Sequence, residues 1–135
     1  MAYWLAKTEP ESFSYADLER LGRDRWNGVK NFAALKHMQN MKPGDLVFIY
    51  HTGKEKSVIG VAEVVSHAYP DPNETDSRLI VVDIEPRYHL DKPVTLREIK
   101  LNPAFQKWEL VRQSRLSVMP VMEEYWQLVH SLAKQ

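Results

Sequence analysis

The chain has 135 residues, of which 44% are hydrophobic and 27% are charged, and these values indicate one globular domain over residues 1–135. It contains no cysteine, which excludes disulfides, thiolate metal sites and thiol catalysis. The 18 basic and 18 acidic side chains cancel to a net charge of zero, which argues against a protein that coats nucleic acid through a pervasive basic surface.

The chain opens with a strand and a short helix. YWLA, residues 3–6, is typical of a strand. Ser14, with Asp17 three residues later, forms a capping box that begins a helix, and Gly22 ends it. A brief helix is therefore expected directly after the first strand.

A second helix follows the stretch RWNGVKN. Asn31 is the predicted N-cap, and the helix continues through Asn40 with apolar side chains along one stripe. The turn KPGD, residues 42–45, then separates this helix from the sheet.

Four apolar stretches predict further strands. LVFIY (46–50) and SVIGVAEVV (57–65) are bounded by turn residues, and HTGKEK (51–56) is the hairpin loop between them. RLIVVDI (78–84) repeats the pattern, and RLSV (115–118) is a later candidate. Short strands with brief helices between them indicate an α+β fold, a small mixed β-barrel with flanking short helices.

The last third of the chain contributes helices. Thr95 and Glu98 form a second capping box, Asn102 begins a further helical turn, and residues 122–133 place apolar side chains at helical spacing. No internal repeat or glycine-rich phosphate loop occurs, and regular long helices do not separate the strands. A doubly wound nucleotide-binding fold is therefore disfavoured.

Charge is unevenly distributed along this neutral chain. Residues 20–42 hold six basic side chains and one acid, whereas residues 71–91 hold six acids and two arginines. If the fold keeps these two segments on different faces, the molecule is polar.

The sequence carries no recognisable catalytic or metal motif. The histidines are scattered through separate elements without HxH or HExxH spacing. Ser114 and Ser117 lie in SRLSV without a nucleophile elbow. Glu9 could act as a general base in a pocket, but pairing with Lys7 or capping of the next turn is the simpler interpretation. We expect no catalytic residue, no metal and no cofactor.

Trp26 has two interpretations, a core anchor or a stacking platform. It lies in polar, glycine-containing and cationic surroundings, which favour a wall that faces a ligand. An aromatic face stacks on any base with about 1–3 kcal/mol, and amides such as Asn27 and Asn31 can read a base edge.

Seven ordered blocks closely resemble the EVE domain family of the PUA-like superfamily. The blocks are YWLAKTEP, RWNGVKN, MKPGDLVFIYH, VIGVAEVV, AYPD, PVTLREIK and LVRQSRLSVMPV, and they cover nearly the whole chain. The resemblance implies one EVE domain over residues 1–135 with a PUA-like fold. It also implies binding rather than catalysis, by analogy with the related YTH domains, which hold a methylated base in an aromatic cage.

The resemblance further implies a pocket beside Trp26 for an extruded, modified base of DNA or RNA. A methyl group adds apolar contact against an aromatic wall, and its insertion requires an unpaired or flipped base. Arg25 and Lys30 are expected to contact phosphates, which position a strand without reading it. The residues expected in the base-binding pocket are Trp26, Asn27, Asn31, Lys7, Thr8, His51, Arg115 and Ser117.

Two features depart from the family pattern. The family usually shows WDGVRN, whereas this chain has WNGVKN, with Asn27 and Lys30 at the changed positions. An amide can donate as well as accept, and Lys lacks the planar fork of Arg, so a different base preference is expected. The loop after AYPD is shorter than in many relatives and has no aromatic residue, which leaves Tyr69 as the only nearby ring for a cage.

The sequence therefore predicts a cytoplasmic, monomeric module that recognises a modified base in RNA or DNA. No membrane partner is expected, because the apolar run in MAYWLAKTEP is too short for a signal peptide or a membrane span. Two alternatives stay open. One is a hydrolytic enzyme acting on a modified nucleoside or base, as in ASCH domains, with Glu9 or His51 as the acid-base group. The other is a protein-interaction adaptor with an exposed apolar patch.

Overall fold

The chain folds around one curled sheet whose strands come from the whole length of the sequence. A computed structural model describes residues 1–134. The strands are β1 (Tyr3–Thr8), β2 (Asp24–Trp26), β3 (Leu46–His51), β4 (Ser57–Val64), β5 (Tyr69–Pro70), β6 (Ile80–Thr95) and β7 (Val118–Val121). The helices are α1 (Tyr15–Leu21), α2 (Phe32–Gln39), α3 (Leu96–Leu101), α4 (Glu109–Arg112) and α5 (Glu123–Ala133), with a 3-10 turn, η1, over Pro103–Phe105.

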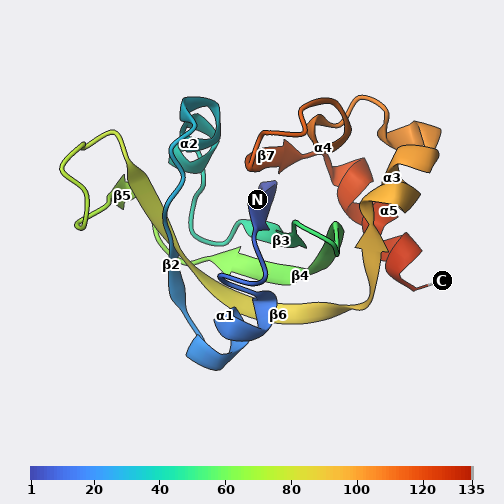
Figure 1. The fold of residues 1–135 in the computed structure, drawn as a ribbon, viewed down its shortest axis with the longest axis horizontal. Helices are drawn as coiled ribbons and strands as arrows, with labels where there is room; N and C mark the ends of the chain where they lie inside the picture. Colours follow the sequence, from blue (N-terminus) through green and yellow to red (C-terminus); the bar gives the residue numbers. More distant parts are fainter. Residues whose placement is uncertain (135) are drawn as a thin grey trace.

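The strand order is β2-β6-β4-β3-β1-β7, and β5 pairs separately with β6. β1 and β3 are parallel, whereas the other pairs are antiparallel. The sheet curls strongly, with the long β6 along its lower side (Figure 1). The edge strands β2 and β7 do not pair with each other within the described chain. The sheet is thus a half barrel with an open seam between β2 and the β1–β7 pair, and the predicted α+β fold with a small mixed barrel is confirmed.

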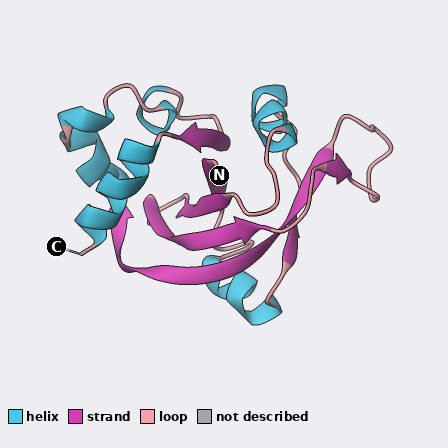
Figure 2. Cartoon of the chain, turned by 180° about the vertical axis from the view of Figure 1, so that it is seen from behind, coloured by secondary structure: helices cyan, strands magenta, loops and turns pink. Residues whose placement is uncertain are grey.

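The helices cover different parts of this sheet. Figure 2 shows α3, α4 and α5 gathered at the end that carries the C-terminus, with α2 and the β5 loop at the opposite end. Trp126 of α5 stacks on Phe48 with ring centroids 4.0 Å apart and on Tyr3 with centroids 4.4 Å apart, which anchors α5 to the sheet. In residues 1–134 no helix combines the length and the apolar character needed to cross a membrane.

Local capping explains where the predicted helices begin. The reciprocal hydrogen bonds of the capping box are present at Ser14 with Asp17 and at Thr95 with Glu98. The side-chain oxygen of Asn31 accepts from the N–H of Ala34 at 3.1 Å and caps α2. These predicted helix starts are confirmed.

Several elements differ from the predicted ones. The sequence pattern missed β2, β5 and α4, which have at most four residues each. β6 continues to Thr95, well beyond the predicted range 78–84, because pairing with β4 sustains it. The last strand is β7 rather than residues 115–118, and it tolerates Pro120 because an edge strand pairs on one side only.

Gly60 of β4 lies where a side chain has no room. A Cβ atom there would lie 2.7 Å from Cζ of Tyr15 and 2.9 Å from the carbonyl oxygen of Tyr88. The Tyr15 hydroxyl lies 2.7 Å from the carbonyl oxygen of Val61 and 3.0 Å from that of Tyr88, so the ring cannot retreat without losing these contacts. We expect Gly60→Ala to lower the free energy of unfolding by about 1–3 kcal/mol, measured by urea denaturation.

The control for this prediction is the Tyr15→Leu background. Leucine removes the ring atoms that a Cβ at position 60 would meet. Gly60→Ala should therefore lower the free energy of unfolding less in the Tyr15→Leu background than in the wild type. Equal costs in the two backgrounds would contradict the packing described above.

Candidate functional site

A cavity of about 490 Å³ lies at the open seam. One wall is formed by β2 and the loop after it, residues 24–30, and the other by the end of β1 with the residues that follow it. Seven sequence-predicted residues line this seam cavity, namely Lys7, Thr8, Arg25, Trp26, Asn27, Lys30 and Ser117. The fold therefore brings together segments that are more than 80 residues apart in the chain, from β1 to Ser117, directly before β7.

Trp26 belongs both to the core and to the cavity wall. Its side chain is only 8% exposed, and it packs edge-on against Phe13 with ring centroids 6.3 Å apart and an interplanar angle of 79°. It also lines the seam cavity. The two interpretations of Trp26 thus coexist, and stacking of a guest on its face stays a prediction.

The loop after Trp26 is shaped by Gly28. This glycine has φ of +77°, and a Cβ atom there would meet nothing within 4 Å. The position therefore favours glycine for its backbone conformation rather than for space. The turn carries the exposed Asn27 and Lys30 on the cavity wall before α2 begins.

Polar contacts hold Lys7 and Thr8 at the opposite wall. Nζ of Lys7 donates to the carbonyl oxygen of Ser114 at 2.9 Å and lies 5.7 Å from the ring centroid of Tyr50. Burial lowers the pKa of Lys7. The Thr8 hydroxyl donates to the carbonyl oxygen of Phe13 at 2.6 Å, which leaves its lone pairs as acceptors.

Three predicted site residues lie outside the seam cavity. Asn31 caps α2 instead. His51 is buried, its Nε2 accepts from the N–H of Tyr15 at 3.0 Å, and its Nδ1 bonds Glu55, so its ring serves the junction of β3 with α1. Arg115 is exposed in the segment before β7. The RLSV residue that reaches the cavity is Ser117, whose carbonyl oxygen accepts from the N–H of Lys7 at 2.8 Å.

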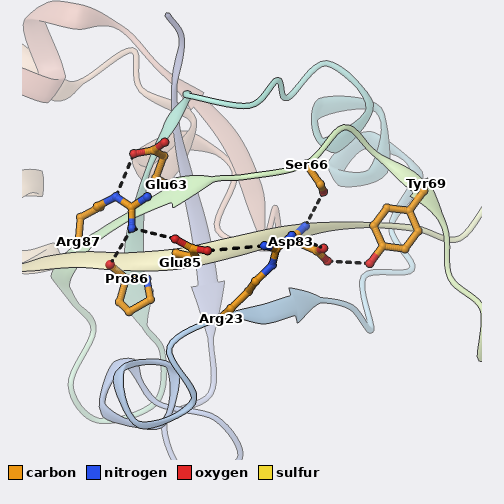
Figure 3. Close-up of polar contacts among 8 residues, drawn as sticks. All are labelled: Arg23, Glu63, Ser66, Tyr69, Asp83, Glu85, Pro86 and Arg87. Carbon is orange, nitrogen blue, oxygen red and sulfur yellow. Dashed lines mark hydrogen bonds and ion pairs between the residues drawn. The ribbon is translucent and has the colours of Figure 1, made fainter.

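The guanidinium of Arg25 is held by Tyr69 of β5. Its Nε donates to the Tyr69 hydroxyl at 3.2 Å, and that hydroxyl donates to Oδ1 of Asp83 at 2.6 Å. Figure 3 shows Tyr69, Asp83 and Arg23 in this network. A neighbouring cavity of about 320 Å³ shares Asp24, Arg25 and Asn27 with the seam cavity. Tyr69 therefore positions Arg25 rather than lining the seam cavity.

The two oppositely charged segments adjoin each other. Arg23 lies 3.1 Å from the carboxylate of Asp83 and 3.7 Å from that of Glu85, because β2 and β6 are antiparallel neighbours. The condition for a polar molecule, that the fold keeps these segments on different faces, is therefore not met where β2 pairs with β6.

Replacing Tyr69 by phenylalanine should reveal the contribution of this network. Burial alone would raise the pKa of Asp83, but hydrogen bonds from Tyr69 and Arg23 outweigh it and leave that pKa lowered. We expect Tyr69→Phe to lower the free energy of unfolding by about 0.5–1.5 kcal/mol at pH 7. The stability that a lowered carboxyl pKa provides is complete above the unfolded value of about 3.9 and is lost as pH falls through the folded value. The difference should therefore shrink as pH falls towards 3.

Urea denaturation at pH 7 and pH 3 would measure this difference. Tyr50→Phe is the control, because burial alone raises the pKa of Tyr50 to about 12 and its hydroxyl bonds no described group. A Tyr69→Phe effect that stays the same in acid would contradict the role of Asp83.

Residues that the sequence did not predict also line the seam cavity. Phe13 and Asp24 contribute an aromatic ring and a carboxylate. Glu9, named above as a candidate general base, is exposed and adds a second carboxylate. No pattern in the sequence singled out Phe13, and Asp24 begins β2, which is too short and too polar to be recognised. Across residues 1–134, no three histidine, aspartate or glutamate side chains gather as ligands for a metal.

A second large cavity, of about 610 Å³, lies between α4 and β7. Lys107, Glu109 and Arg112 lie on its wall, together with residues of β7. Of the residues predicted for base or phosphate contact, this cavity contains none. We therefore place the candidate site at the smaller seam cavity, where those residues converge.

Known proteins share this sequence pattern and fold. The EVE domain model matches residues 2–132. An uncharacterized protein of Schizosaccharomyces pombe is 32% identical, over 98% of this chain and 69% of its own length. Rpa0253 from Rhodopseudomonas palustris has a structure with a TM-score of 0.94 and 39% identity, covering 99% of this chain and 94% of that one. The human THYN1 protein, solved in complex with DNA containing 5-methylcytosine, has a TM-score of 0.92 and 27% identity, covering 100% and 99%.

Proposed function

Because the chain belongs to the EVE domain family, we propose that it is a module that binds nucleic acid carrying a modified base, and that this base enters the seam cavity beside Trp26. The observation that carries the proposal is the convergence of seven predicted residues on one cavity. The complex of the human THYN1 protein with DNA containing 5-methylcytosine supports the choice of ligand.

The chemistry of the seam cavity suits a planar, partly apolar guest. Its volume of about 490 Å³ lies within the range of about 300–1,000 Å³ for small-molecule sites. The indole of Trp26 and the ring of Phe13 supply apolar contact for a methyl group, while Asn27 supplies a donor and an acceptor for the base edge. A base reaches such a cavity only when it is unpaired or flipped.

Basic side chains at the cavity provide the contacts with the strand. Arg25 and Lys30 are the proposed phosphate contacts, and Lys7 adds a third positive charge on the opposite wall. These charges stand next to the carboxylates of Glu9 and Asp24. We therefore expect the affinity for nucleic acid to fall as the salt concentration rises. The module would contact one nucleotide and its neighbouring phosphates, in DNA or in RNA.

Titration with matched oligonucleotides tests this function. Single-stranded oligonucleotides that differ only in 5-methylcytosine or cytosine at one position would be titrated by fluorescence anisotropy, as DNA and as RNA. We expect tighter binding of the modified strand, and Asn27→Ala should reduce that preference. Lys107→Ala, in the cavity between α4 and β7, is the matched control and should leave the preference unchanged. Absence of binding to every strand at low salt would overturn the proposal.

A further inference from the structure

The backbone of Arg25 is free on the open edge of β2. Arg25 lies opposite Asp83 in the β2–β6 pair. The carbonyl oxygen of Asp83 accepts from the N–H of Val65 at 2.9 Å, and the N–H of Asp83 donates to Oγ of Ser66 at 2.9 Å, a contact that Figure 3 shows. Both backbone groups of Asp83 therefore point away from β2, towards the β4 side.

The alternation of an antiparallel ladder then places the groups of Arg25. Opposed residues alternate between pairs that exchange both backbone hydrogen bonds and pairs that exchange none. Because Asp83 turns both groups to the other side, Arg25 and Asp83 form a pair without hydrogen bonds. Asp24 and Trp26, one position to either side, belong to the hydrogen-bonded pairs. The N–H and C=O of Arg25 consequently point away from β6, towards the seam.

These two groups find no partner within residues 1–134. Arg25 forms a hydrogen bond through its side chain, to Tyr69, and none of its backbone groups bonds another described segment. Arg25 is half-buried and lines the seam cavity directly beside Trp26. Because each backbone N–H and C=O is a strong hydrogen-bonding group, one donor and one acceptor at this edge are available to a ligand.

We propose that the backbone N–H and C=O of Arg25 read the edge of an amino-bearing pyrimidine, so that the seam cavity accepts cytosine-type bases and rejects thymine. This inference rests on the proposed function. Cytosine carries an acceptor ring nitrogen, N3, next to a donor amine, N4. The Arg25 N–H donates to N3 and the Arg25 C=O accepts from N4.

Thymine is the informative competitor. It carries the same methyl group as 5-methylcytosine, so contact of that methyl with Trp26 cannot separate the two bases. In the same pose thymine turns its N3–H towards the Arg25 N–H and its O4 towards the Arg25 C=O. The carboxylates of Glu9 and Asp24, which line the cavity, add acceptors that suit an amine and repel a carbonyl oxygen.

The expected discrimination follows from these reversed contacts. A well-placed pair of hydrogen bonds discriminates against the wrong base by about 10- to 100-fold in affinity. We expect single-stranded oligonucleotides with 5-methylcytosine to bind about 10- to 100-fold more tightly than the same strands with thymine at that position.

Amide hydrogen exchange of the ¹⁵N-labelled full chain provides a backbone-specific test. Without oligonucleotide, the Arg25 amide should exchange faster than those of Asp24 and Trp26, which lie in the hydrogen-bonded pairs. The 5-methylcytosine strand should slow exchange at Arg25, whereas the thymine strand, at equal saturation, should not. A role of the Arg25 side chain alone would not change exchange at its amide in this base-dependent way.

Two variants separate the backbone from the side chain. Arg25→Ala keeps the N–H and C=O, so it should weaken binding of both strands while preserving their ratio. Arg25→Pro removes the N–H, which an edge strand tolerates on its open side, and should bring the ratio close to 1. Circular dichroism would verify folding, and the wild-type exchange experiment decides the question if this variant does not fold.

The outcomes distinguish the role of the Arg25 backbone from the proposed binding of a modified base. If the 5-methylcytosine strand binds but the Arg25 amide exchanges unchanged, or if the thymine strand binds equally well, the role of the Arg25 backbone is overturned and the proposed function stands. If no strand binds at all, both are overturned.

Discussion

Replacing Trp26 by alanine is expected to lower the free energy of unfolding by about 3–5 kcal/mol and to abolish the preference for a modified base. The large stability effect follows from burial, because the side chain is only 8% exposed and packs against Phe13. The loss of preference follows from its place on the wall of the seam cavity. Urea denaturation would measure the first effect and anisotropy titration the second.

A stability-matched control separates these two effects. Leu110 of α4 is buried in the core and does not line the seam cavity. Leu110→Ala should cost about 2–5 kcal/mol and yet retain the preference for 5-methylcytosine. If Trp26→Ala, still folded by circular dichroism, keeps the wild-type preference, Trp26 is a core residue only and the proposed pocket is wrong.

Replacing Asp45 by alanine should destabilise the fold by about 3–5 kcal/mol without changing the base preference of the folded fraction. Asp45 is buried, and its carboxylate accepts from the N–H of Ala2, from Nε1 of Trp4 and from the N–H of Lys42, each at 3.0 Å. Alanine leaves all three donors without their partner. The carboxylate thus joins the start of β1 to the turn before β3.

Asp45→Asn provides the control for this second prediction. The amide of Asn keeps one oxygen as an acceptor. The free energy of unfolding of Asp45→Asn should therefore lie between those of the wild type and Asp45→Ala. Urea denaturation followed by tryptophan fluorescence measures all three proteins. An alanine variant within about 0.5 kcal/mol of the wild type would contradict the structural role, since that is the usual size of surface effects.

Helix caps and apolar strands of this protein can be predicted from the sequence. The capping boxes at Ser14 and Thr95 join groups three residues apart, and both occur as expected. LVFIY and SVIGVAEVV form β3 and β4 because continuous apolar stretches between turns leave few alternatives. Ordered motifs over the whole chain also indicated the EVE family, which the family match confirms.

Individual site residues were only partly predictable. His51 ends a strand that the sequence revealed, yet its ring bonds the N–H of Tyr15, 36 positions away in the chain. Asn31 fits a base-edge amide and a helix cap equally well by residue type, and the fold uses it as the cap. The sequence predicted a phosphate contact for the guanidinium of Arg25. The strand pairing, which no residue pattern predicts, leaves its backbone N–H and C=O on the open edge of β2.

The seam and its cavity depend on contacts that no local pattern encodes. β2 has three residues and mostly polar side chains, and it exists because β6 pairs with it across about 60 positions of sequence. That pairing forms the ion pair between Arg23 and Asp83, and it places Trp26 across the cavity from β1 and Ser117. Helix caps and apolar strands follow from interactions between near neighbours, whereas the register of distant strands follows from packing the whole sheet, which decides which side chains and backbone groups face the cavity.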